Sequence, residues 1–257
     1  MSISPSDQEV FWPEAFQSLF CQTVKPAEIV CFIDGALSEK QGQLLKKLLT
    51  PTVKVLKSDS PKGLGFALNQ AVQFCTNEYI ARFDSDDVCV ESRFESQIEF
   101  ISKNQDIDIL GTNAEELLEN GHLGKIRIMP ESNKDIRKKI WKCPIIHPSV
   151  MYKRSKILAV GNYNINLKRR QDYDLWFRCY ITKLVFHNLQ KIGIRYRIKK
   201  PRKKTYMQAL DQAKIGVKYC IQEKMGIIPV IGCLFPLVAT VLPDSGIVRS
   251  FRNRLRY

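Results

Sequence analysis

Residues 78–87 are the part of the sequence that most constrains the fold, because an apolar stretch ends there in Asp84, Asp86 and Asp87. The pattern of residues 78–83 predicts a short strand, and the aspartates follow where such a strand would leave a sheet. Carboxylates this close together repel one another unless a cation or several donors neutralise them. A divalent ion such as Mg²⁺ or Mn²⁺ would do so. The alternative is a solvated acidic turn that caps the next helix, and this stretch alone does not decide between the two.

Apolar runs that predict strands alternate with amphipathic segments through residue 110. Strands are expected at residues 28–33, 53–57, 78–83 and 107–110, and helices are expected between them. This alternation predicts an α/β fold with a doubly wound, mostly parallel sheet flanked by helices. A chain of 257 residues is long enough for one large domain with an appendage. We therefore predict a catalytic domain over residues 1–198 and a helical, basic and apolar C-terminal extension over residues 199–257.

Ligands of doubly wound sheets bind outside the carboxyl ends of the strands. Asp34 follows one predicted strand and Asp84 follows another, so the two side chains are expected to converge although fifty residues separate them. Lys62 and Gly63 precede a predicted helix, where glycine lets backbone amides approach a phosphate. This second signal is weak, because a glycine-containing turn is usually only a turn.

The N-terminus is unusually short for such a fold. Only residues 1–4 could form the expected first strand, because a polar loop with a proline follows directly. Either the first strand is a stub or the start codon has been assigned downstream of the true one. No signal peptide is visible in the first ten residues, which are polar.

The net charge of +14 is concentrated near the C-terminus. From Arg195 onward, fourteen Lys or Arg residues face only three acidic ones. Such a basic segment implies a phosphate-rich partner, either an anionic membrane or a nucleic acid. The eight cysteines are scattered singly without a Cys-x-x-Cys pair, which favours reduced thiols in a cytosolic protein over zinc ligands or disulfides.

Two further segments carry candidate functional residues. His147 stands alone before a proline and an alternating strand pattern, where a histidine is more often structural than catalytic. Asp172 and Asp174 stand at a predicted helix start, and the helical spacing turns Trp176 inward. Three consecutive cations at residues 168–170 precede this helix and form an electropositive wall beside the carboxylates.

Five motifs, in this order, resemble glycosyltransferase family 2, and in particular its bacterial branch that builds exopolysaccharide, capsule and O-antigen chains. They are EIVCFIDG (28–35), KGLGFALN (62–69), ARFDSDD (81–87), HPSVMY (147–152) and QDYDLWFR (171–178). The resemblance runs from about residue 2 to residue 197. It implies a GT-A fold, inversion at the anomeric carbon, a UDP-sugar donor and a divalent metal, Mn²⁺ or Mg²⁺, at an Asp-x-Asp motif.

The resemblance also implies a role for individual residues. Asp172 would be the general base that deprotonates the acceptor hydroxyl, although Gln171 replaces the usual preceding glutamate. The nucleotide would contact Asp34, Lys62, Gly63, Arg82 and Asp84. The metal would be held by Asp86, with Asp87 and His147 as further ligands. The acceptor or a phosphate would contact Arg169, Arg170, Asp174 and Trp176.

Residues 225–243 contain no charge and are flanked by basic runs at 199–204 and 249–256. Their glycines and prolines argue against one straight membrane-spanning helix. We expect an interfacial anchor on the anionic inner face of the membrane, with a buried helical hairpin as the alternative. The resemblance favours the anchor, because such enzymes extend saccharides carried on polyprenyl diphosphate. The protein is accordingly expected to be cytoplasmic and peripheral to the membrane.

Two other classes of protein share some of these features. A metal-dependent nucleotidyltransferase would also combine such a sheet with aspartates, but the glycine-rich basic signature of that class is missing after the first strand. A nucleic-acid binder would use the basic tail, but it would leave the strand-end carboxylates unexplained. No nucleic-acid-binding motif is evident, so no nucleic-acid partner is expected.

Overall fold

The first sheet is parallel and comes from the N-terminal part of the chain. In the computed structural model, which describes residues 1–198 and 206–241, its strands lie in the order β1 (Ser2–Ile3), β2 (Ile29–Asp34) and β3 (Val53–Ser58). Ile3 of β1 pairs with Ile33 and is fully buried. The stub expected at residues 1–4 is therefore a true strand of the sheet.

Three helices accompany this sheet: α1 (Trp12–Phe20), α2 (Glu39–Leu48) and α3 (Leu64–Phe74). Trp12, Phe16 and Leu45 pack with the buried side chains of β1 and β2 in one apolar cluster. α2 begins with a capping box, in which Ser38 and the residue three positions later exchange side-chain and backbone hydrogen bonds. The amphipathic spacing of these segments thus forms the helices that it predicts.

The second sheet is mixed. Its strands lie in the order β4 (Tyr79–Ala81), β8 (Met151–Lys153), β6 (Ile109–Leu117), β9 (Phe186–Arg197) and β5 (Val88–Cys89), and β7 (Leu123–Arg127) pairs with β6. Here only β6 and β9 are parallel, while the other four pairings are antiparallel. The α/β architecture is confirmed, with a parallel sheet flanked by helices. The antiparallel pairs come mainly from the part of the chain where the strand and helix alternation is lost.

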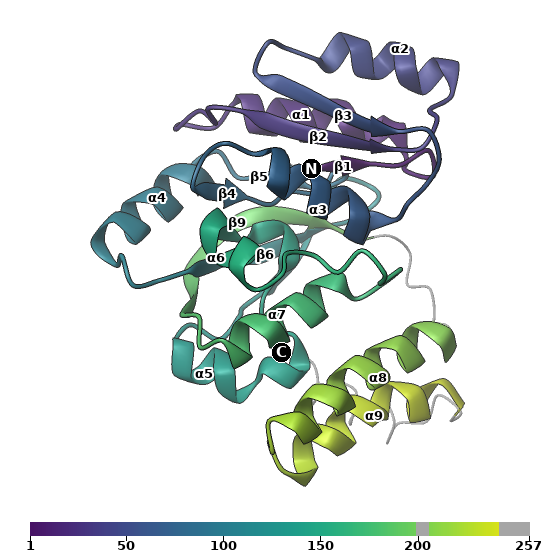
Figure 1. The fold of residues 1–257 in the computed structure, drawn as a ribbon. Coiled ribbons are helices and arrows are strands. Elements are labelled where there is room, and N and C mark those ends of the chain that lie inside the picture. Colours follow the sequence, from purple (N-terminus) through teal and green to yellow (C-terminus); the bar gives the residue numbers. More distant parts are fainter. Residues whose placement is uncertain (199–205, 242–257) are drawn as a thin grey trace.

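The remaining short elements cover the second sheet and its ends (Figure 1). They are α4 (Arg93–Lys103), α5 (Asn133–Lys138), α6 (Arg154–Ala159) and α7 (Gln171–Ile181), with one-turn 3-10 helices η1 (Glu9–Phe11), η2 (Ile140–Lys142) and η3 (His147–Ser149). The largest apolar cluster is centred on α7, whose Trp176 and Phe177 are fully buried. α7 is therefore a rigid support for whatever its first turn presents.

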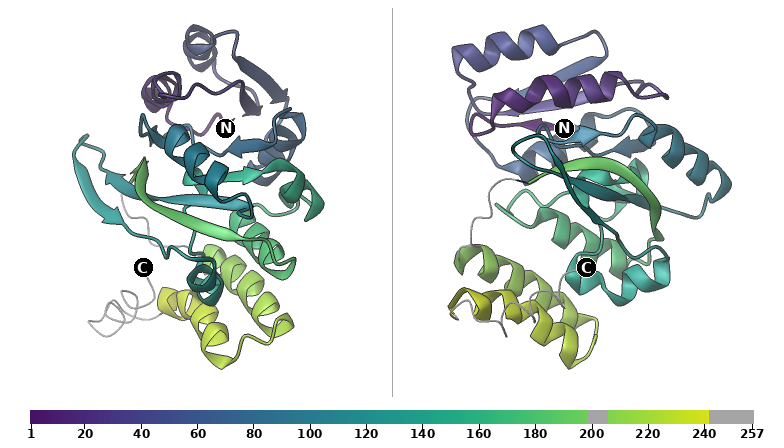
Figure 2. Two further views of the ribbon diagram at one scale, coloured as in Figure 1. Left: turned by 90° about the vertical axis from the view of Figure 1, so that its left-hand side faces the viewer. Right: turned by 180° about the vertical axis from the view of Figure 1, so that it is seen from behind.

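Two C-terminal helices, α8 (Tyr206–Gln222) and α9 (Ile227–Val241), form a hairpin at the end of the molecule away from β1 to β3 (Figures 1 and 2). The Tyr219 ring stacks on Phe177 of α7 with centroids 4.9 Å apart, and its hydroxyl donates to Asp174 over 2.9 Å. Within residues 1–198 and 206–241, no helix is long and apolar enough to cross a membrane. The basic runs at 199–204 and 249–256 lie outside the described residues.

Gly65 provides a test of the contact that joins α3 to the segment before α7. An added Cβ at Gly65 would lie 2.7 Å from the Asn164 carbonyl oxygen, whereas one at Gly42 of α2 would meet nothing within 4 Å. We expect Gly65→Ala to lower the free energy of unfolding by about 1–3 kcal/mol, because backbone must shift. Gly42→Ala should instead raise it by up to about 1 kcal/mol, through helix propensity. Urea denaturation measures both, and equal changes of the same sign would contradict this account.

Candidate functional site

A cavity of about 420 Å³ lies at the carboxyl ends of β2 and β4. Asp34 and Asp84 both line it, so the convergence expected of these distant carboxylates is confirmed. The other lining residues are Ser2, Ser4, Ser6, Asp7, Pro61, Gly63, Leu64, Ser85 and Asp86. The residues contributed by the first seven positions were not expected from the sequence, because a two-residue strand and a polar loop carry no local signature of a site.

Asp34 holds the turn that precedes α3. Its Oδ1 accepts hydrogen bonds from the Lys62 amide at 2.6 Å and from Ser58 Oγ at 3.2 Å, and its Oδ2 accepts one from the Gly63 amide at 2.8 Å. Gly63 has φ +98°, a conformation that favours glycine. Backbone amides at this helix start thus face a buried carboxylate, while the Lys62 side chain is exposed. Any nucleotide contact of Asp34 must use the acceptor capacity left after these three bonds.

The three aspartates after β4 are the candidate metal ligands. One oxygen from each of Asp84, Asp86 and Asp87 lies within 4.8 Å of the others. Asp87 is 1% exposed, and its Oδ2 is buried with no hydrogen-bond partner among the described residues. Burial, together with the charge of Asp84, raises the pKa of Asp87 well above its ordinary value. An orphaned buried oxygen beside two further carboxylates fits a hard divalent cation, which prefers oxygen ligands.

Arg82 lies behind this cluster rather than in the cavity. Its Nη2 is 2.5 Å from Asp84 Oδ1, and its side chain is almost fully buried. Burial alone would lower the pKa of Arg82, but the ion pair with Asp84 outweighs it and raises that pKa. Nε and Nη1 have no partner among the described residues. The nucleotide contact expected for Arg82 is therefore indirect in this arrangement, through the aspartate that it orients.

His147 is buried in η3, and its Nε2 lies 2.8 Å from the Tyr163 hydroxyl. Burial, and then the charge of Arg82, hold the pKa of His147 well below its ordinary value, so the imidazole is neutral. His147 is not part of the carboxylate cluster found within the described ranges. Its contacts favour a structural role, in which it supports Tyr163 without adding a second charge beside Arg82.

Asp172 occupies the first turn of α7 and is partly exposed. Burial raises the pKa of Tyr163, and the charge of Asp172 adds to that shift. Arg170 precedes the helix with φ 60°, in the left-handed region. A partly exposed carboxylate at a helix start can accept a proton from a hydroxyl that enters from solvent.

The other residues predicted to contact the acceptor lie away from the cavity at the carboxylates. Asp174 accepts from Arg178 Nε at 2.8 Å and from Tyr219 at 2.9 Å, so both oxygens are used inside the protein. Trp176 is 0% exposed and faces inward, as its spacing predicts, and its contacts are those of core packing. Arg169 is exposed and lies 3.5 Å from Asp211 of α8. None of these residues lines the cavity at the carboxylates.

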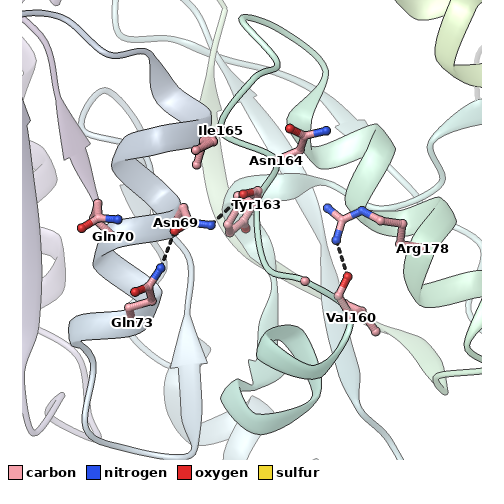
Figure 3. A pocket seen from close by; sticks show the side chains of 9 residues that line it. Asn69, Gln70, Gln73, Val160, Tyr163, Asn164, Ile165 and Arg178 are labelled. Atoms are coloured by element: carbon pink, nitrogen blue, oxygen red, sulfur yellow. Dashed lines mark hydrogen bonds between the residues drawn. The ribbon is translucent and has the colours of Figure 1, made fainter.

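A second and larger cavity, of about 530 Å³, opens between α3 and residues 160–165 (Figure 3). It holds none of the predicted site residues, and its polar groups tie the segment down. Asn69 Nδ2 donates to the Tyr163 carbonyl at 2.8 Å, and Arg178 Nη1 donates to the Val160 carbonyl at 2.6 Å (Figure 3). We assign the chemistry to the smaller cavity, because only that one contains the carboxylates.

Arg197, at the end of β9, fixes the aspartate loop, and the sequence alone did not reveal this. Its amide donates to Asp87 Oδ1 at 2.8 Å and its Nε donates to the Asp86 carbonyl at 2.7 Å. Its Nη2 pairs with Glu14 at 2.5 Å, while the guanidinium lies 4.0 Å from the centre of the Phe11 ring. In the sequence, Arg197 is one of many cations in a basic segment and nothing distinguishes it.

Comparison with known proteins shows the family. The model of the family described as "Glycosyl transferase family 2" matches residues 9–161. The chain belongs to glycosyltransferase family 2. Membership in this family decides against the nucleotidyltransferase and nucleic-acid-binding alternatives.

Two curated relatives and one solved structure illustrate where this glycosyltransferase sits among similar proteins. UDP-Gal:alpha-D-GlcNAc-diphosphoundecaprenol beta-1,3-galactosyltransferase of Escherichia coli is 30% identical over 227 residues, which is 87% of this chain and 78% of that protein. O-antigen biosynthesis glycosyltransferase WbnJ of Escherichia coli is 31% identical over 188 residues, 72% of this chain and 73% of that one. The structure of S. aureus TarS 1–349 in complex with UDP-GlcNAc superposes with a TM-score of 0.67 at 16% identity, covering 93% of this chain and 71% of that one. The last comparison confirms the GT-A fold of the glycosyltransferase.

The role of Arg197 can be separated from general charge effects on β9. We expect Arg197→Ala to lower the free energy of unfolding by about 2 kcal/mol, because it removes charged hydrogen bonds at a buried site. Arg195 provides a matched control two residues away on the same strand, since it is about half exposed and lies 4.0 Å from Glu115. Arg195→Ala should cost less than about 0.5 kcal/mol. Chemical denaturation measures both values, and similar losses would show that Arg197 is not a special support.

Proposed function

We propose that this glycosyltransferase moves a sugar from a UDP-sugar to a hydroxyl group of a saccharide carried on polyprenyl diphosphate, with inversion at the anomeric carbon. The observation that carries the proposal is the cavity in which Asp34 and Asp84 meet beside the buried, unpartnered oxygen of Asp87. The relative with a diphosphoundecaprenol acceptor and the neighbour in complex with UDP-GlcNAc support the choice of acceptor and donor.

The residues of the cavity divide between the nucleotide and a metal ion. Asp84, Asp86 and Asp87 would hold Mn²⁺ or Mg²⁺, which supplies positive charge to the diphosphate as it leaves. The remaining acceptor capacity of Asp34 and the turn at Lys62 and Gly63 face the nucleoside end. Arg82 fixes the orientation of Asp84 from behind, so the loop need not reorganise when the nucleotide enters.

Asp172 would supply the base on the acceptor side. Its carboxylate takes the proton of the acceptor hydroxyl while the hydroxyl oxygen attacks the anomeric carbon and the bond from that carbon to the phosphate oxygen breaks. UDP leaves with the electron pair, so one displacement inverts the configuration and no covalent enzyme intermediate forms. We place this reaction at the inner face of the cell membrane, where a lipid-linked acceptor would lie, with the protein attached peripherally.

The metal and nucleotide site is tested without knowledge of the acceptor. We expect UDP with Mn²⁺ to raise the melting temperature of the wild-type protein, because a ligand that binds only the folded state stabilises it. Asp86→Ala should abolish the metal-dependent part of that shift. Asp106→Ala, at an exposed aspartate before β6, should leave the shift unchanged. If no nucleoside diphosphate stabilises the wild type with either metal, the proposal is overturned.

The base is tested by separating binding from chemistry. We expect Asp172→Asn to lower the transfer rate by about 10²–10⁴-fold, the range typical of a missing general base. The UDP and Mn²⁺ melting shift should persist, since Asp172 is not in the nucleotide cavity. A panel of UDP-galactose, UDP-glucose and UDP-N-acetylhexosamines identifies the donor, and proton NMR of the product gives its anomeric configuration. Full activity of Asp172→Asn, or a retained configuration, would refute this mechanism.

A further inference from the structure

The outer side of α9 is apolar and exposed. Ile227 and Ile228 are each 73% exposed and Ile231 is 53% exposed, with Leu234 and Val238 further along the same side. Their spacing of one, three or four residues keeps them on one stripe of the helix. Residues 227–241 contain no charged side chain at all. A surface helix that faces water normally carries polar or charged residues there, so this stripe fits an apolar environment.

The inner side of α9 is already occupied by the protein. Gly232 lies against the Trp141 ring so closely that no side chain would fit between them, and Cys233 is 1% exposed. Cys233 Sγ also lies 3.8 Å from Cys220 Sγ of α8. The helix is therefore held in place by one side, and its exposed stripe is not part of the folded core. The inner side of α9 therefore agrees with the packed helical hairpin, and its exposed outer side agrees with the interfacial anchor.

α5 and η2, which carry several lysines, lie close to α9 at the same end of the molecule. α5 and α9 share one end of the molecule in every view (Figures 1 and 2), and η2 packs on α9 through Trp141. Lys138 and Lys139 are exposed, and Lys142 Nζ lies 5.1 Å from the centre of the Trp141 ring. Asp135 is the one acidic residue between positions 133 and 142, against five Lys or Arg. An apolar stripe flanked by cations has the character of an interfacial helix on anionic lipid.

We propose that α9 and the α5–η2 lysines form one surface that rests on an anionic lipid bilayer, with α9 lying in the plane of the interface. The inference deepens the proposed function and rests on it for the reason why the enzyme needs a membrane. The geometry of the acceptor side agrees with this placement. α8, the partner of α9, packs on α7, whose first turn carries Asp172, and Asp211 of α8 lies 3.5 Å from Arg169. The acceptor end of the site therefore borders the hairpin that touches the lipid.

Vesicle co-sedimentation of the full-length protein tests the surface. Wild type should pellet with vesicles of phosphatidylcholine and phosphatidylglycerol, and much less with phosphatidylcholine alone. Lys138→Gln with Lys139→Gln should weaken the partition coefficient by about fivefold for each lysine. Ile228→Gln with Ile231→Gln should weaken it by roughly tenfold or more. Two controls should leave it unchanged: the pair Lys46→Gln with Lys47→Gln on α2, and the single substitution Ile98→Gln at an exposed residue of α4.

The outcomes separate this inference from the proposed function. Two results would refute the proposed lipid-binding surface. The wild type stays in the supernatant with the anionic vesicles, or the control substitutions weaken vesicle binding as much as the α5 and α9 substitutions do. Wild-type dimers that dissociate on Ile228→Gln with Ile231→Gln, without vesicle binding, would assign the stripe to a second copy of the chain instead. The UDP and Mn²⁺ melting shift of each variant reports on the fold and the active site. If the wild type shows no melting shift with UDP and Mn²⁺, the proposed function is overturned. Binding of the wild type to anionic vesicles would still support the proposed lipid-binding surface.

Discussion

Repulsion among Asp84, Asp86 and Asp87 is the constraint around which the site is built. Arg82 neutralises one of these carboxylates from behind, and Arg197 secures the loop through its backbone and the Asp87 carboxylate. With all three aspartates ionised, the group and Arg82 carry a formal charge of −2, because Arg197 is paired with Glu14. A divalent cation matches that charge and would also give the buried Asp87 oxygen a partner. Without a cation, burial and the charge of Asp84 raise the pKa of Asp87 well above its ordinary value.

An ion pair, a hydrogen bond and charge effects connect the two ends of the candidate site. Asp84 pairs with Arg82. Burial and then the charge of Arg82 lower the pKa of His147, whose Nε2 lies 2.8 Å from the Tyr163 hydroxyl. Burial raises the pKa of Tyr163, and the charge of Asp172 adds to that shift. Because the segment that carries Tyr163 is tied to α3, the metal side and the base side share one rigid frame. Pre-organisation of this kind is what a single displacement requires, since the donor and acceptor must be held in line.

Local patterns predicted the parts of the site that depend on local rules. The strand ends with Asp34 and Asp84 and the inward face of α7 follow from periodicity and turn chemistry. Ser2 and Ser4 were missed because a two-residue strand has no period, and Arg197 was missed because its partner Asp87 is 110 residues away. Long-range pairing of this sort leaves no spacing to detect. The antiparallel pairing of β8 with β4 and β6 was not predicted for the same reason, because tertiary packing sets these partners.

The C-terminal segment shows why a sequence can support two alternatives at once. Burial against the domain and insertion into lipid both select apolar residues, so nineteen uncharged residues cannot distinguish them. In the fold, opposite sides of α9 suit the two environments, since Cys233 is buried against the protein while Ile228 is exposed on the outer side. A packed inner side also fixes the direction in which the outer side points, which a flexible anchor would not do. If the outer side contacts lipid, α7 and its Asp172 are then held at a set height above the bilayer, as transfer to a headgroup-proximal saccharide demands.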